Sequence, residues 1–181
     1  MKYQLSITLS ENEYLTFNIF HSFESAPGKK TVRKTRIIYI AVMVILIALV
    51  FLLLGRSVFS VVYALLLGLI TIVYMLLFKK ILTHNMKSQI KKLKKLGKLP
   101  YDPVSSFEFF DDKLVESTAS KRIEHSYSDI ERICVVKDRF ILLYYSSIGA
   151  YTLPISQVTQ QLNPESFLSF LAEKCSQVEY Y

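Results

Sequence analysis

Two long uncharged apolar segments dominate the hydropathy pattern of the chain, and only three residues separate them. The first runs from Ile37 to Leu54 and the second from Val58 to Phe78, with Gly55-Arg56-Ser57 between them. As helices they would be about 27 and about 32 Å long, enough to cross a hydrocarbon core of about 30 Å. Because three residues cannot return a chain across a bilayer, the pattern predicts a transmembrane hairpin of two antiparallel helices.

The N-terminal residues 1–36 alternate first at the period of a strand and then at that of a helix. Tyr3 to Leu9 alternates apolar and polar residues, which predicts a half-buried strand. Ser10 and Glu13 fit a capping box for a helix from Glu11 to about Phe23, which Ala26-Pro27-Gly28 ends. Since a lone strand is not stable, we expect this segment to dock on the C-terminal sheet.

Residues 79–100 continue the second apolar segment as a basic amphipathic juxtamembrane helix, and Gly97 and Pro100 predict its end. Its narrow apolar stripe consists of Leu82, Met86, Ile90, Leu93 and Leu96. Three interpretations remain open: a helix lying on anionic lipid, the seam of a helical dimer, and a solvated stalk that packs on its own cytoplasmic domain. In the first, the residues that contact lipid headgroups would be Lys87, Lys91, Lys94 and Lys95.

After residue 100 the pattern changes to short segments typical of strands joined by tight turns. The predicted strands cover residues 106–110, 113–118, 122–127, 131–137, 140–145 and 150–153. Asp111-Asp112 and Asp138-Arg139 are the predicted turns, and Asn163-Pro164 predicts the start of a closing helix. Residues 101–181 are therefore expected to form a small antiparallel α+β domain.

Charge predicts the orientation of the hairpin. Residues 25–101 contain fourteen Lys or Arg and no Asp or Glu, whereas the connection between the helices contains only Arg56. Because Lys and Arg are enriched in cytoplasmic flanks, we expect a multi-pass protein of the cell membrane with both termini in the cytoplasm. The net charge of +7 comes from this membrane-proximal belt, so it is poor evidence for nucleic-acid binding.

Four segments, taken in order, resemble the YcxB-like family of bacterial membrane proteins: SFEFFDDKLVES, HSYSDIERI, FILLYYSSIGAYTLPISQV and NPESFLSFLAEK. LSENEYLTFNIFHSF resembles the acidic-aromatic opening that precedes the two spans of that family. The resemblance implies a pleckstrin-homology-like C-terminal domain, in which a bent antiparallel sheet or barrel is closed by a C-terminal helix. It implies no catalytic residues and no defined biochemical role. Asp111, Asp112 and Lys113 depart from the cation cluster that phosphoinositide binding requires.

Candidate chemistry is sparse. His21, His84 and His125 lie in three different segments, without the spacing of a metal site. Cys134 and Cys175 are expected to be reduced structural thiols. The apolar segments contain no charged residue, His, Asn, Gln or Pro, which argues against an ion or proton path. We therefore expect a protein that is not an enzyme, with no catalytic, cofactor or metal site.

Two functional interpretations remain open. The favoured one is a membrane-anchored cytoplasmic binding or scaffold module that recruits a peptide or protein, for example by strand addition. The alternative is a membrane-structural homo-oligomer, or more weakly a pore, which the cytoplasmic domain regulates. Ser60, Ala64 and Gly68 give the second helix a small face for close packing, either within the hairpin or between copies. The expected partners are the bilayer, anionic headgroups, a protein or peptide and further copies of the chain, but no nucleic acid.

Overall fold

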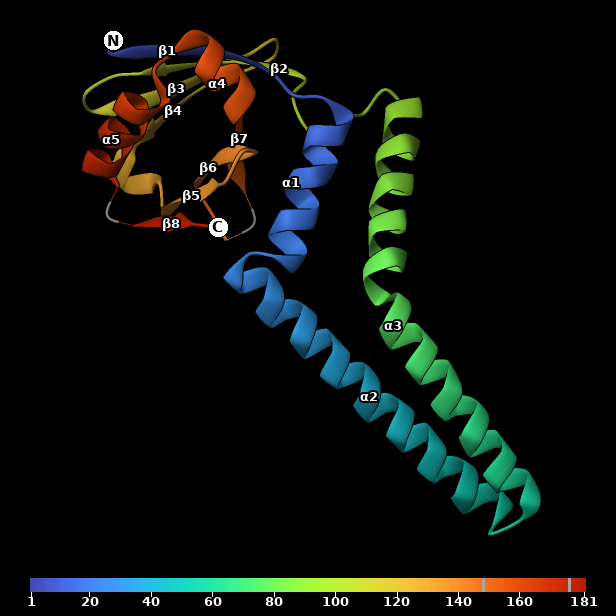
Figure 1. Ribbon diagram of the computed structural model, residues 1–181. Helices are drawn as coiled ribbons and strands as arrows, with labels where there is room; N and C mark the ends of the chain where they lie inside the picture. Colours follow the sequence, from blue (N-terminus) through green and yellow to red (C-terminus); the bar gives the residue numbers. More distant parts are fainter. Residues whose placement is uncertain (148, 176) are drawn as a thin grey trace. The chain divides into compact units, whose positions relative to one another are not determined.

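The computed structural model describes residues 1–181 except residues 148 and 176. The described chain forms two compact units, which Figure 1 shows as a set of strands and short helices and as a pair of long helices. The first unit combines Met1–Phe17 with Leu96–Tyr181, and the second covers Asn18–Lys95. The first unit is therefore discontinuous in sequence, with the long helices inserted into it.

The second unit contains α2 (Ala26–Leu54) and α3 (Val58–Lys95), both long and apolar enough to cross a membrane by length and composition. The structure confirms that α3 continues without a break through the basic segment after Phe78. In contrast, α2 begins well before the predicted apolar span, and its first turns carry the basic residues that precede Ile37. The rings of Tyr39 and Tyr74 stack with centroids 4.3 Å apart, which joins the two helices.

Serine side chains order the start of both long helices. Ser25 Oγ accepts a hydrogen bond from Gly28 N at 3.1 Å and donates to the carbonyl of His21 at 2.6 Å. A Cβ atom at Gly28 would lie 1.9 Å from that carbonyl oxygen, so only glycine fits this turn. At α3, Ser57 and Ser60 accept hydrogen bonds from each other's backbone N–H groups. Ser57 therefore caps α3, and Ser60 in the first turn bonds back to it, which satisfies amides that a helix start leaves open.

The described residues of the first unit form two sheets of four strands each. In the order β1-β2-β3-β4, one antiparallel sheet consists of β1 (Tyr3–Thr8), β2 (Val104–Phe109), β3 (Lys113–Thr118) and β4 (Arg122–Ser126). In the order β7-β6-β5-β8, the other consists of β5 (Arg132–Val136), β6 (Phe140–Tyr144), β7 (Ala150–Pro154) and β8 (Val178–Tyr180). β1 pairs antiparallel with β2, so the N-terminal strand joins the sheet formed by residues 104–126.

One apolar core joins both sheets and the helices α4 (Ile155–Gln161) and α5 (Pro164–Lys174). Leu5 and Phe107 come from the first sheet, Leu143 from the second and Phe167 from α5. Asn163 Oδ1 caps α5 by accepting from Glu165 N at 3.0 Å, as its sequence predicts. Between the sheets, a short 3-10 turn, η1 (Tyr127–Asp129), places Tyr127 in the same core.

Side chains of α4 cover the free edge of β1. Gln157 accepts a hydrogen bond from Thr8 N at 2.9 Å and donates to Thr8 O at 2.8 Å. Gln161 does the same at Ser6, with both distances 2.8 Å. The two amides thus occupy the backbone groups that a further strand would use, which protects an edge otherwise open to strand addition.

The expected antiparallel barrel is wrong in two respects. Among the described residues no barrel is closed, because the edge strands β4 and β7 share no backbone ladder and amide side chains cover β1. β8 pairs parallel with β5, although only antiparallel strands were predicted. Neither β8 nor α4 is predicted from the sequence, since β8 has three residues and α4 presents one buried residue, Val158.

Candidate functional site: an aromatic pocket with a buried carboxylate

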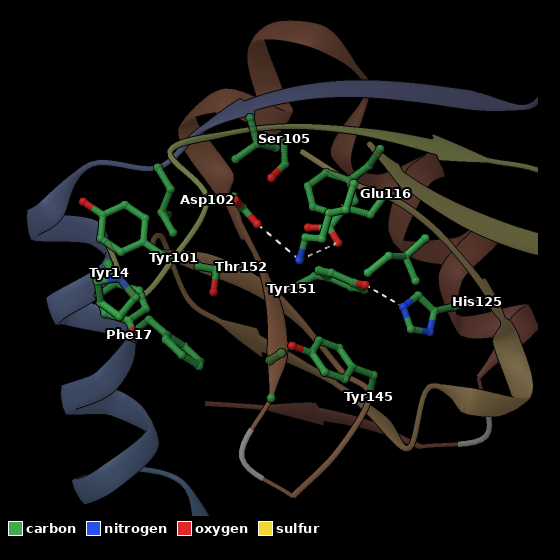
Figure 2. Close-up of a pocket in the computed structure, with 18 residues that line it drawn as sticks. Tyr14, Phe17, Tyr101, Asp102, Ser105, Glu116, His125, Tyr145, Tyr151 and Thr152 are labelled. Carbon is green, nitrogen blue, oxygen red and sulfur yellow. Dashed lines mark hydrogen bonds and ion pairs between the residues drawn. The ribbon is translucent and has the colours of Figure 1, made fainter. Parts of the chain in front are cut away.

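A pocket of about 370 Å³ opens in the first unit, between residues of both sheets and the first turns of α1 (Glu11–Phe23). Figure 2 shows Tyr14, Phe17 and Tyr101 grouped on one side of it, with Glu116, His125 and Tyr145 away from that group. The Ser10–Glu13 capping box orders this end of α1: Glu13 N donates to Ser10 Oγ at 3.2 Å, and Ser10 N donates to Glu13 Oε2 at 2.8 Å.

Glu116, on β3, is a buried carboxylate in the wall of this pocket. The residue is 5 % exposed and lies two positions after Leu114, on the same face of β3, and Leu114 is fully buried in the core. Its Oε2 atom accepts no hydrogen bond from the part of the chain that the structure describes. Lys121 Nζ lies 3.6 Å from Oε2, an ion-pair distance that is too long for a hydrogen bond.

Lys121 is shared between two carboxylates. Its Nζ is 3.2 Å from Asp102 Oδ2, closer than it is to Glu116. Burial alone lowers the pKa of Lys121, but the hydrogen bond to Asp102 and the charges of Glu116 and Asp102 raise it above the ordinary value. The ammonium group therefore stays charged at neutral pH. Thr118 N donates to Lys121 O at 2.8 Å, so the β3–β4 turn holds the lysine in this position.

Tyr151 and His125 join the edge strands β7 and β4 across the pocket. The Tyr151 hydroxyl and His125 Nε2 are 2.6 Å apart, and the histidine tautomer decides which of them donates. The ring centroids of Tyr145 and Tyr151 are 4.8 Å apart, and Tyr145 stacks on His125 at 5.7 Å. Burial and the charge of Glu116 raise the pKa of Tyr151, which therefore remains a neutral phenol.

A second aromatic pair stands on the other side. The rings of Tyr14, from α1, and Tyr101, from the segment before β2, stack with centroids 4.5 Å apart and an interplanar angle of 26°. Both segments connect the first unit to the long helices in sequence, Tyr14 through α1 and Tyr101 through the residues that follow α3. The pocket therefore contains a polar floor of one lysine and two carboxylates between aromatic walls.

The predicted lipid-contacting lysines lie elsewhere, in the last turns of α3. Lys87, Lys91, Lys94 and Lys95 are exposed, and none of them lines this pocket. The accompanying apolar stripe is uneven, since Ile90 is buried and Leu96 is exposed. The structure therefore places these four lysines together on one helix of the second unit.

Two further predicted features can be located. Cys134 and Cys175 are both buried and free, and burial raises the pKa of the Cys134 thiol to about 12 and that of Cys175 above its ordinary value. On the small face of α3, a Cβ atom at Gly68 would meet nothing within 4 Å. Packing within the hairpin therefore does not require a glycine there.

Sequence reasoning missed the pocket as a site. It considered His125 only as a metal ligand and found no other histidine at a suitable spacing, and it did not single out Glu116 or Lys121. The available signal was Glu116 itself, an acidic residue two positions after Leu114 on the inward face of a predicted strand. Comparisons with protein-family models, with curated proteins and with solved structures find no match to this chain.

Proposed function

We propose that this chain is a membrane-anchored recognition module, whose α+β unit binds a ligand in the aromatic pocket. The proposal rests on the buried Glu116 carboxylate, whose Oε2 atom accepts no hydrogen bond from a described residue. A cavity of about 370 Å³ falls within the usual size of small-ligand sites, which combine apolar walls with a few placed polar groups. The resemblance to the YcxB-like family and its pleckstrin-homology-like domain is compatible with this role and remains a prediction.

The membrane part of the proposal is supported by the surface of the long helices. Their apolar side chains point outward, with Leu52 80 % and Leu76 78 % exposed. Burial of such surface is worth about 25 cal/mol per Å², so an aqueous environment would be strongly unfavourable. Basic residues precede the apolar part of α2 and follow that of α3, which supports a hairpin in the cell membrane with both tails in the cytoplasm.

At the edge of β1, strand addition is disfavoured, whereas the pocket is open to a ligand. Gln157 and Gln161 already bond the outward backbone groups of β1, so an added strand would first have to displace them. A partner that inserts a side chain, or a small molecule, needs no such rearrangement. In addition, Lys87, Lys91, Lys94 and Lys95 remain proposed contacts for anionic headgroups, because lysines close to a membrane attract acidic lipid.

The test is a pocket-filling substitution in the full chain, reconstituted in lipid nanodiscs. Ala150 lines the pocket, so Ala150→Trp should fill part of it, whereas Ala172→Trp on the exposed face of α5 is the matched control. A small-molecule fragment library containing cations, anions and neutral compounds would be screened by ligand-observed NMR. We expect binding to the wild type and to Ala172→Trp that Ala150→Trp abolishes. Equal binding to all three proteins, or no bound fragment of any charge, would refute the pocket as a recognition site.

A further inference from the structure

The pocket contains more negatively charged than positively charged side chains. Asp102 and Glu116 provide two carboxylates, and Lys121 provides one ammonium group that lies closer to Asp102. Glu116 Oε2 lies at ion-pair distance from Lys121 Nζ, 3.6 Å, but accepts no hydrogen bond from a described residue, although the side chain is only 7 % exposed. A buried carboxylate oxygen without a hydrogen bond is unfavourable, so a donor supplied by a ligand would be stabilised there.

The same charges exclude an anionic ligand. A carboxylate or phosphate could approach Lys121, but it would then lie beside Glu116 and Asp102, which already neutralise that lysine. Glu116 is only 7 % exposed, so solvent screens its repulsion of a nearby anion less than at the surface, whereas Lys121 and Asp102 are 44 % and 38 % exposed. The electrostatics of the pocket thus favour a ligand that is positively charged at its inner end.

The aromatic walls are suited to the same ligand. Tyr14 and Tyr101 form a stacked pair, and Tyr145 and Tyr151 form a tilted pair with centroids 4.8 Å apart and an interplanar angle of 45°. The face of an aromatic ring carries partial negative charge and attracts a cation within about 6 Å of its centroid. Ring faces also pack favourably against a carbon chain, so they would hold the apolar part of an alkylamine.

We propose that the pocket binds an organic cation, with an alkylammonium or guanidinium group donating to Glu116 and its carbon chain lying against the tyrosine rings. This inference rests on the proposed function and adds the chemical class of the ligand. The cation can be a free amine or the side chain of a lysine or arginine in a partner, because both present the same group. Lys121 and Asp102 complete the polar floor around it.

The experiment compares three probes of nearly equal shape on the full chain in lipid nanodiscs. n-Butylammonium is the cation, n-butanol is its neutral counterpart and n-butyrate is the anion, with empty nanodiscs as the blank for partition into lipid. We expect n-butylammonium to bind at least about 10-fold more tightly than the other two, a margin of about one unit in log affinity. Comparison of Nα-acetyl-lysine amide with n-butylammonium then distinguishes a peptide side chain from a free amine, with Nα-acetyl-norleucine amide as the neutral control.

Two variants test the assigned groups. Glu116→Gln keeps the shape of the side chain but removes its charge, so it should abolish the preference for n-butylammonium over n-butanol. Glu131→Gln makes the same exchange at an exposed position outside the pocket and should preserve that preference. Tyr145→Leu removes one ring from a side chain that is 40 % exposed, so the fold should persist while cation binding weakens several-fold.

Three outcomes would overturn the cation assignment: equal binding of n-butylammonium and n-butanol, tightest binding of n-butyrate, and cation binding that neither Glu116→Gln nor Tyr145→Leu weakens. In each of these cases the pocket can still bind another class of fragment, and Ala150→Trp reports on that separately. The failure of this inference is therefore distinguishable from the failure of the proposed function.

Discussion

The N-terminal strand should contribute to the stability of the C-terminal domain, and the substitution Leu5→Ala tests this contribution directly. Leu5 is fully buried in the core and lies opposite Phe107 on β2. The substitution removes three buried carbon atoms, worth about 2.4 kcal/mol at about 0.8 kcal/mol each. The cavity left behind adds to this, so we expect a loss of about 3 kcal/mol in the free energy of unfolding.

The loss can be measured by pulse proteolysis of the full chain in detergent micelles over a urea series. With a urea dependence of about 2 kcal/mol per M, 3 kcal/mol lowers the unfolding midpoint by about 1.5 M. Leu96→Ala makes the same substitution at a residue that is 70 % exposed and should leave the midpoint nearly unchanged. If residues 101–181 resist cleavage equally in the wild type and in the Leu5→Ala variant, then the N-terminal strand contributes nothing to that fold, and the discontinuous domain is refuted.

Three further predictions concern the edge of β1, the buried thiol and the basic helix. Replacing Gln157 and Gln161 with alanine should lower the free energy of unfolding by about 2 kcal/mol, at about 1 kcal/mol for each glutamine, and should increase association seen by size-exclusion chromatography. Unchanged stability would show that these two amides do not protect β1. Because burial holds the folded pKa of Cys134 at about 12, whereas an unfolded thiol ionises near 9, the stability this group contributes is full below pH about 9 and falls as pH rises towards 12. Chemical denaturation should show that the free energy of unfolding falls less steeply with pH in Cys134→Ala, by up to about 1.4 kcal/mol per pH unit. An identical pH dependence in both proteins would contradict the raised pKa of Cys134. In a peptide of residues 79–100, replacement of four lysines with glutamine should weaken binding to phosphatidylserine vesicles by up to about 4 kcal/mol, and by less in high salt; the four are Lys87, Lys91, Lys94 and Lys95. Equal binding of the unchanged peptide to neutral vesicles would favour the solvated stalk over lipid contact.

The elements that could be predicted from the sequence are those that local patterns determine. The helix that starts after Ser10 follows from its capping box, and α5 follows from Asn163 and Pro164. Alternation located the N-terminal strand, and short apolar segments bounded by turn residues located most other strands within one or two residues. These features require no knowledge of what the segment packs against.

Features that depend on distant partners could not be predicted in the same way. α4 is held by Val158 and by glutamines that bond β1, more than a hundred residues earlier in the chain. β8 has three residues and acquires its strand geometry only by pairing with β5. The pocket brings together Tyr14, Asp102, Glu116 and Tyr151, which share no sequence motif, so only the fold assembles them.

The location of the pocket relative to the membrane tests the central claim most directly. Single cysteines would replace Arg56, in the connection between the long helices, and Tyr145, at the exposed part of the pocket. Both native thiols are buried, so background labelling should be low. In intact cells an impermeant maleimide should label the cysteine at Arg56 at once and the cysteine at Tyr145 only after permeabilisation. Labelling at Tyr145 in intact cells would place the pocket outside and contradict a cytoplasmic recognition module anchored by the hairpin.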